Sequence, residues 1–188
     1  MKDDLSLKWK RTKHQDLYVN AQKNIQLRSI FAQQLIPQIV KKRVIINFDE
    51  IVLSGTTGRC YSWASIQCHA GRNFKTDVSG LSIMLAITSE GSIFFQFLDG
   101  NNNECSVSAF FVALADHLDY HYSDWRDTHM LLLDNCPSHK TAITIKTLER
   151  LNMPVMFSAP ASFKAIPVEG MFGAIKGIDF SKIADPDP

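Results

Sequence analysis

The chain has 188 residues, of which 45% are hydrophobic and 21% charged, as is usual for a globular protein with one domain of ordinary size. No apolar run reaches the ~20 residues of a membrane-spanning helix, and the N-terminal stretch MKDDLSLKWKRTKHQ lacks the apolar core of a signal peptide. We therefore expect an intracellular protein that does not enter a membrane. The four cysteines have no paired spacing, so we expect reduced thiols and no zinc ribbon.

Charge is distributed unevenly along the chain, although the net charge is only +1. Residues 1–43 contain ten Lys or Arg against three Asp, which leaves the remainder acidic. This pattern predicts a basic helical leader or linker over 1–43 that contacts phosphates, attached to a carboxylate-rich domain. A solvated helix face would explain the same charges.

The first half of the chain predicts one helix and then several strands. An amphipathic helix is expected over about 20–40, with Pro37 breaking or kinking it. The β-branched stretch RVIINFDEIVLS predicts a strand that ends on Asp49. A further strand is expected around 61–66, and LSIMLAITSEGSIFFQFLDG predicts two strands joined by a tight turn at 89–92.

The second half alternates helices and strands. A helix is expected over about 106–120, a buried strand in HMLLLDN, and a helix in SHKTAITIKTLERLN with Asn152 as its C-terminal cap. A short strand in MPVMFSAP and a last helix in PVEGMFGAIKG follow. Antiparallel strands followed by strand–helix crossovers predict an α/β fold, a mixed sheet with helices on both faces.

Three carboxylates lie at the ends of these predicted elements: Asp49, Asp134 and Glu169. Neighbouring strands present their ends side by side, so Asp49 and Asp134 could lie within a few ångströms of each other. Carboxylates that close repel unless a cation lies between them, and Mg²⁺ prefers oxygen ligands. Two such ions about 3.5–4 Å apart would support the cleavage of a phosphodiester.

Each residue also has a simpler explanation when it is taken alone. Asp134 could cap the following helix, and Glu169 could complement a helix dipole. Glu50 is predicted to point to the opposite face of its strand and to have a structural or supporting role. His117 and His121 could ligate zinc from one helix face, but the glutamate of the zincin motif is missing between them.

The motifs NFDE, LLLDNCPSH and SAPASFKAIPVEGMFGAIK resemble the catalytic domain of mariner-like DDE transposases, which share the ribonuclease-H-like fold of retroviral integrases. The Asp-Asn-x-Pro-x-His sequence and the intervals of 84 and 34 residues between the three acids carry the resemblance. It implies a ribonuclease-H-like, five-stranded mixed sheet with helices on both faces. The DDE catalytic domain would span 44–178, and a C-terminal tail 179–188.

The resemblance also implies an activity, namely DNA cleavage and strand transfer with transposon ends and target DNA as partners. Asp49, Asp134 and Glu169 would be the catalytic residues and would bind two Mg²⁺ or Mn²⁺ ions. A homodimer would form the active assembly, in the nucleus if the source is eukaryotic.

Further residues take roles from the same resemblance. Residues expected to orient Asp134 or to contact DNA are Asn135 and His139, and residues expected to contact phosphates are Lys164 and Lys176.

The chain departs from the family in the segment 159–166, where Ala, Ser and Ile replace expected Pro, Tyr and Asn residues. The 48 residues before Asp49 are also too few for the family's paired helix-turn-helix modules. Two alternatives therefore stand beside the transposase: a decayed or domesticated protein that binds DNA or a partner without catalysis, and another ribonuclease-H-like nuclease.

Overall fold

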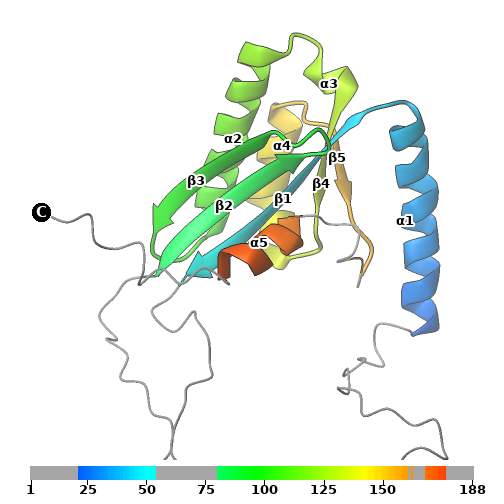
Figure 1. Ribbon diagram of the computed structural model, residues 1–188, viewed down its shortest axis with the longest axis horizontal. Coiled ribbons are helices and arrows are strands. Elements are labelled where there is room, and N and C mark those ends of the chain that lie inside the picture. Colours follow the sequence, from blue (N-terminus) through cyan, green and yellow to red (C-terminus); the bar gives the residue numbers. More distant parts are fainter. Residues whose placement is uncertain (1–20, 54–79, 161, 163–167, 177–188) are drawn as a thin grey trace, which may run out of the picture.

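The computed structural model describes residues 21–53, 80–160, 162 and 168–176 (Figure 1). The elements are α1 (Gln22–Val40), β1 (Val44–Leu53), β2 (Leu81–Thr88), β3 (Ile93–Asp99), α2 (Glu104–His121), α3 (Trp125–Thr128), β4 (His129–Leu133), the 3₁₀ turn η2 (Pro137–Lys140), α4 (Ala142–Arg150), β5 (Val155–Phe157) and α5 (Val168–Lys176). No helix in these described ranges is long and apolar enough to cross a membrane.

The five strands form one mixed sheet, as predicted, and their order in the sheet is β3-β2-β1-β4-β5. β1, β2 and β3 pair antiparallel, whereas β4 and β5 run parallel to β1 and are reached through helices. β1 is therefore the central strand, and it has an antiparallel neighbour on one side and a parallel neighbour on the other.

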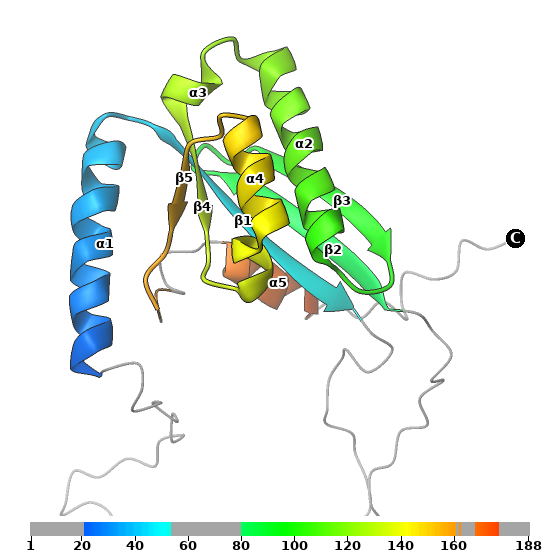
Figure 2. The same ribbon diagram turned by 180° about the vertical axis from the view of Figure 1, so that it is seen from behind.

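Helices cover both faces of the sheet. Figure 2 shows α2 and α4 in front of it, where Phe48 of β1 is buried with Phe110 and Leu148. Figure 1 shows α5 on the other face, where Phe172 packs on β1 and β2. α1 packs its Phe31 on that same face over β1 and β4.

β1 is longer than predicted, and this corrects the expectation that Asp49 closes the strand. Its antiparallel partner β2 continues the ladder from Asp49, opposite Leu85, as far as Leu53, opposite Leu81. Because β2 supplies hydrogen-bond partners beyond Asp49, the carboxylate does not end the strand. Only the parallel pairing with β4 stops earlier, at Asn47.

Two helix predictions also need correction. Pro37 lies inside α1 and does not break it, because the helix continues to Val40 and the Pro37 carbonyl accepts a hydrogen bond from the Lys41 N–H at 3.0 Å. The helix predicted in SHKTAITIKTLERLN is divided into η2 and α4, and α4 starts where Thr141 accepts a hydrogen bond from the Thr144 N–H.

The other predicted elements are confirmed where they are described. Asn152 has φ 49° just after α4, the left-handed conformation expected of a residue that ends a helix. The strand expected around 61–66 lies outside the described residues.

Candidate active site

Two of the three predicted carboxylates come from neighbouring parallel strands in matching register. β1 pairs with β4 from Val44 opposite His129 to Asn47 opposite Leu132. Asp49 and Asp134 each follow that last pair by two residues, so a continuation of this register beyond the pairing would place them opposite each other. The backbones of both acids therefore leave the β1–β4 pairing at the same end, where paired strands lie about 4.8 Å apart.

The third carboxylate, Glu169, belongs to α5, and this helix packs on the face of the sheet on which Asp49 lies. Side chains alternate along a strand, so Asp49 lies on the same face of β1 as Ile51, which is buried against α5. Val168 and Phe172 anchor α5 to β1 and β2. Glu169 is the second residue of α5, so its backbone lies in the first turn of this helix, while its side chain is outside what the structure describes.

Asp134 lies directly after β4, as predicted, but it does not cap the next helix. Its Oδ1 accepts a hydrogen bond from the Cys136 N–H at 2.8 Å, which closes a local turn. The same Oδ1 lies 2.7 Å from His139 Nδ1, close enough for an ion pair although the two atoms lack hydrogen-bond alignment. Burial would raise the pKa of Asp134, but His139 and the Cys136 N–H outweigh it and lower that pKa, so Asp134 is a carboxylate at neutral pH.

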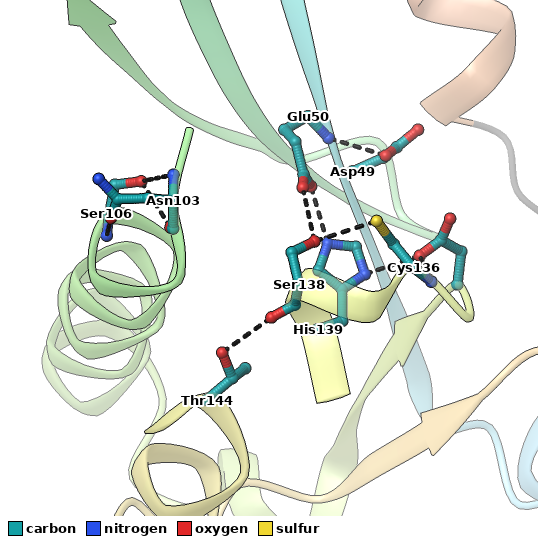
Figure 3. A network of polar contacts seen from close by, with 9 residues as sticks. Asp49, Glu50, Asn103, Ser106, Cys136, Ser138, His139 and Thr144 are labelled. Atoms are coloured by element: carbon teal, nitrogen blue, oxygen red, sulfur yellow. Dashed lines mark hydrogen bonds and ion pairs between the residues drawn. The ribbon is translucent and has the colours of Figure 1, made fainter. Parts of the chain in front are cut away.

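Glu50 is a member of the site for which the sequence predicted only a structural or supporting role. Figure 3 shows Glu50 pointing from β1 toward Ser138 and His139, and Asp49 pointing away from them. The Glu50 Oε2 lies 2.8 Å from His139 Nε2, so the imidazole is held between two carboxylates. Burial would lower the pKa of His139, but its contacts with Asp134 and Glu50 raise it to about 10. Residues 46, 48 and 50 lie on the same face of β1, and Ile46 and Phe48 are buried. An acid at the next position on this buried face was the signal in the sequence that could have indicated the contact made by Glu50.

The side chain of Asn135 contacts Ser158 and Lys140, while its predicted role of orienting Asp134 or contacting DNA stays a prediction. Its amide Nδ2 donates to the Ser158 carbonyl just after β5, and its Oδ1 accepts from Lys140 Nζ. Lys140 Nζ also lies 4.9 Å from the centre of the Phe157 ring. In the structure Asn135 therefore joins the ends of β4 and β5. Lys164 lies outside the described residues, as does the side chain of Lys176.

The oxygen donors near Asp49 suit an oxygen-preferring divalent cation. Asn47 lies two residues before Asp49 on the same face of β1, and its buried Oδ1 has no hydrogen-bond partner. Carboxylate and amide oxygens are ligands that Mg²⁺ accepts. Among the described side chains no three His, Cys, Asp or Glu groups come close enough to hold a metal ion, and the side chain of Glu169 lies outside that described set.

The zinc alternative on α2 is not supported by the described residues. The rings of His117 and His121 lie 4.4 Å apart, but no third ligand joins them within the described part of the chain. His117 instead packs on Phe94 at 5.2 Å between ring centres. Burial, with a smaller contribution from His121, lowers the pKa of His117.

Solved structures with a similar fold include several of the Mos1 mariner transposase. A crystal structure of the Mos1 mariner paired-end complex with Mn superposes with a TM-score of 0.68 at 16% identity, covering 90% of this chain and 54% of that chain. The catalytic domain of Mos1 mariner transposase gives a TM-score of 0.60 at 16% identity, with 89% of this chain and 76% of that chain covered. This chain has the fold of the mariner transposase catalytic domain.

The likeness to Mos1 is structural. No protein-family model matches the sequence, and no curated protein matches it either. At 16% identity the superposition establishes the fold alone. The chain spans about half the length, 54%, of the Mos1 transposase in the paired-end complex with Mn.

Proposed function

We propose that this chain is the catalytic domain of a metal-dependent DNA transposase, which hydrolyses a phosphodiester at a transposon end and transfers the freed strand to target DNA. The observation that supports the proposal is the parallel pairing of β1 and β4, on a fold shared with Mos1, which ends two residues before both Asp49 and Asp134. α5 supports it further, because it brings Glu169 to the same face of β1.

In this proposal Asp49, Asp134 and Glu169 hold two Mg²⁺ or Mn²⁺ ions. When bound, such ions activate the attacking water or 3′-hydroxyl and stabilise the leaving oxygen. Two features of the chain prepare its carboxylates to bind cations, since the low pKa of Asp134 keeps it ionised and the Glu50 N–H donates to Asp49 Oδ1 at 2.8 Å. The Mos1 catalytic domain has been solved with Mg and with Mn.

DNA is the proposed partner. The Mos1 structures with this fold include a paired-end complex with a left transposon end and a strand transfer complex. On this chain the exposed Lys140 lies beside the site, where it could contact a phosphate. The basic leader 1–43, the domain 44–178, the tail 179–188, the homodimer and the nuclear location remain predictions.

The test of this function measures Mn²⁺ affinity by calorimetry and the nicking of supercoiled plasmid DNA in Mn²⁺. Asp134→Asn keeps the shape of the side chain but removes its charge. We expect the affinity for Mn²⁺ to fall by more than about tenfold. Removing a residue that only supports a metal ligand already lowers metal affinity by about 10–100-fold, and Asp134 is itself a proposed ligand. Nicking should fall to the level without protein.

The matched control is Asp116→Asn, which removes an exposed carboxylate on α2. It should bind Mn²⁺ and nick DNA as the wild type does. Equal Mn²⁺ affinity of wild type and Asp134→Asn would refute the proposed function. DNA binding without metal-dependent nicking would favour the decayed or domesticated protein, and preferred cleavage of RNA–DNA hybrids would favour a ribonuclease H.

A further inference from the structure

A chain of three side chains, Glu50, His139 and Asp134, crosses from one face of β1 to the end of β4. Its two contacts measure 2.8 Å, between Glu50 Oε2 and His139 Nε2, and 2.7 Å, between His139 Nδ1 and Asp134 Oδ1. The exposed fraction of the side chain is 14% for Glu50, 0% for His139 and 38% for Asp134. The fully buried His139 therefore joins the largely buried Glu50 to the more exposed Asp134, the proposed catalytic carboxylate.

The imidazole of His139 is held in place by its neighbours and by its own backbone. The ring packs against the Phe48 ring with 5.4 Å between ring centres, and the backbone N–H of His139 donates to the Cys136 carbonyl at 3.0 Å. The buried Thr144 hydroxyl donates to the Ser138 carbonyl at 3.0 Å, which ties η2 to α4. A ring held in this way transmits the position of Glu50 to Asp134.

The contacts to Asp134 are unequal between its two oxygens. Both of the contacts that described residues make, from Cys136 N–H and from His139 Nδ1, go to Oδ1. Contacts to one oxygen restrict the rotation of the carboxylate, and Oδ2 receives neither of them. Partners of this kind, one step behind a metal ligand, orient that ligand and raise metal affinity.

We propose that Glu50 is a positioning residue for the proposed reaction, and that it acts through His139 to fix the carboxylate of Asp134 with Oδ2 available to a divalent cation. The metal in this inference rests on the proposed function, whereas the positioning of the Asp134 carboxylate by Glu50 and His139 rests on the geometry alone. Glu50 itself touches neither metal nor DNA in this scheme.

The experiment uses the full chain and two readouts. The first is a crystal structure of metal-free Glu50→Gln, in which we expect the His139 ring to shift and the Asp134 carboxylate to rotate, because an amide is a weaker hydrogen-bond acceptor for His139 Nε2 than the carboxylate at 2.8 Å. The second is Mn²⁺ affinity by calorimetry, which should fall by about tenfold or more. Glu50→Asp, which keeps the charge, should retain most of the affinity and is the variant to use if Glu50→Gln does not fold.

The matched control is Asp119→Asn, which removes a carboxylate from an ion pair that has only a structural role. Asp119 accepts from Trp125 Nε1 at 2.7 Å and pairs with Arg126 at 2.5 Å, away from the site. It should lower the melting temperature and leave Mn²⁺ affinity unchanged.

An unchanged Asp134 carboxylate in Glu50→Gln, or a Mn²⁺ affinity within about twofold of wild type, would overturn the proposal. If wild type does not bind Mn²⁺ at all, the proposed function fails, and the orientation of Asp134 in Glu50→Gln alone decides whether Glu50 positions it.

Discussion

Asp49 and Glu50 are consecutive residues that belong to different layers of the molecule. Because side chains alternate along β1, Asp49 lies on the face covered by α5, while Glu50 lies on the face of Phe48 and reaches His139. In the proposed scheme this alternation separates two roles: Asp49 binds metal on one face of β1, and Glu50 contacts His139, the partner of Asp134, on the other face.

A second buried histidine, His129, leads to a prediction about how the stability of the protein depends on pH. His129 opens β4, is 5% exposed, and has its Nδ1 2.9 Å from the Thr128 hydroxyl. Burial lowers its pKa from 6.5, and the charges of Glu90 and Asp124 only partly offset this. The unfolded chain then binds more protons than the folded chain below about pH 6.5, so stability falls as the pH decreases through that range.

The check is the melting temperature of wild type and His129→Gln, measured from about pH 7 to about pH 5. The wild-type curve should fall more steeply than that of the variant, which has no imidazole to protonate. Parallel curves would show that His129 does not contribute to acid sensitivity.

Among the elements, α2 is stabilised by a reciprocal arrangement at its start. Asn103 Oδ1 accepts from the N–H groups of Cys105 and Ser106, both at 2.9 Å, and Ser106 Oγ accepts from the Asn103 N–H at 2.9 Å. This is a capping box, which satisfies donors that a helix start leaves free.

Removing this cap gives a prediction for the element. Asn103→Ala should lower the free energy of unfolding by about 1 kcal/mol, within a range of roughly 0.5–2 kcal/mol. Urea denaturation followed by far-UV circular dichroism measures it. Asn101→Ala, at an exposed position two residues earlier, should change stability by less than about 0.5 kcal/mol. Equal effects of the two variants would contradict the role of the cap.

For the whole molecule, local pattern predicted the sheet well because its strands and helices differ clearly in period and length. The end of β1 was missed, since the β2 ladder that extends it past Asp49 is a tertiary contact. Asp134 was predicted from its position after an apolar strand. For Glu50 the sequence predicted a structural or supporting role, but its partner His139 could not be predicted, because it lies 89 residues away and nothing local indicates the pair.

β1 also connects the three hydrophobic clusters, which makes it the place to test the cooperativity of the molecule. Phe48 is fully buried against α2, Ile51 packs under α5, and Ile45 packs under α1. Phe48→Ala should lower the free energy of unfolding by about 3–5 kcal/mol, through lost burial and a cavity. Because one strand serves all three clusters, far-UV circular dichroism and tryptophan fluorescence should shift together to lower urea concentration. Val52→Ala, on the same strand but 39% exposed, should shift neither by much. Separate transitions in Phe48→Ala would show that the clusters unfold independently.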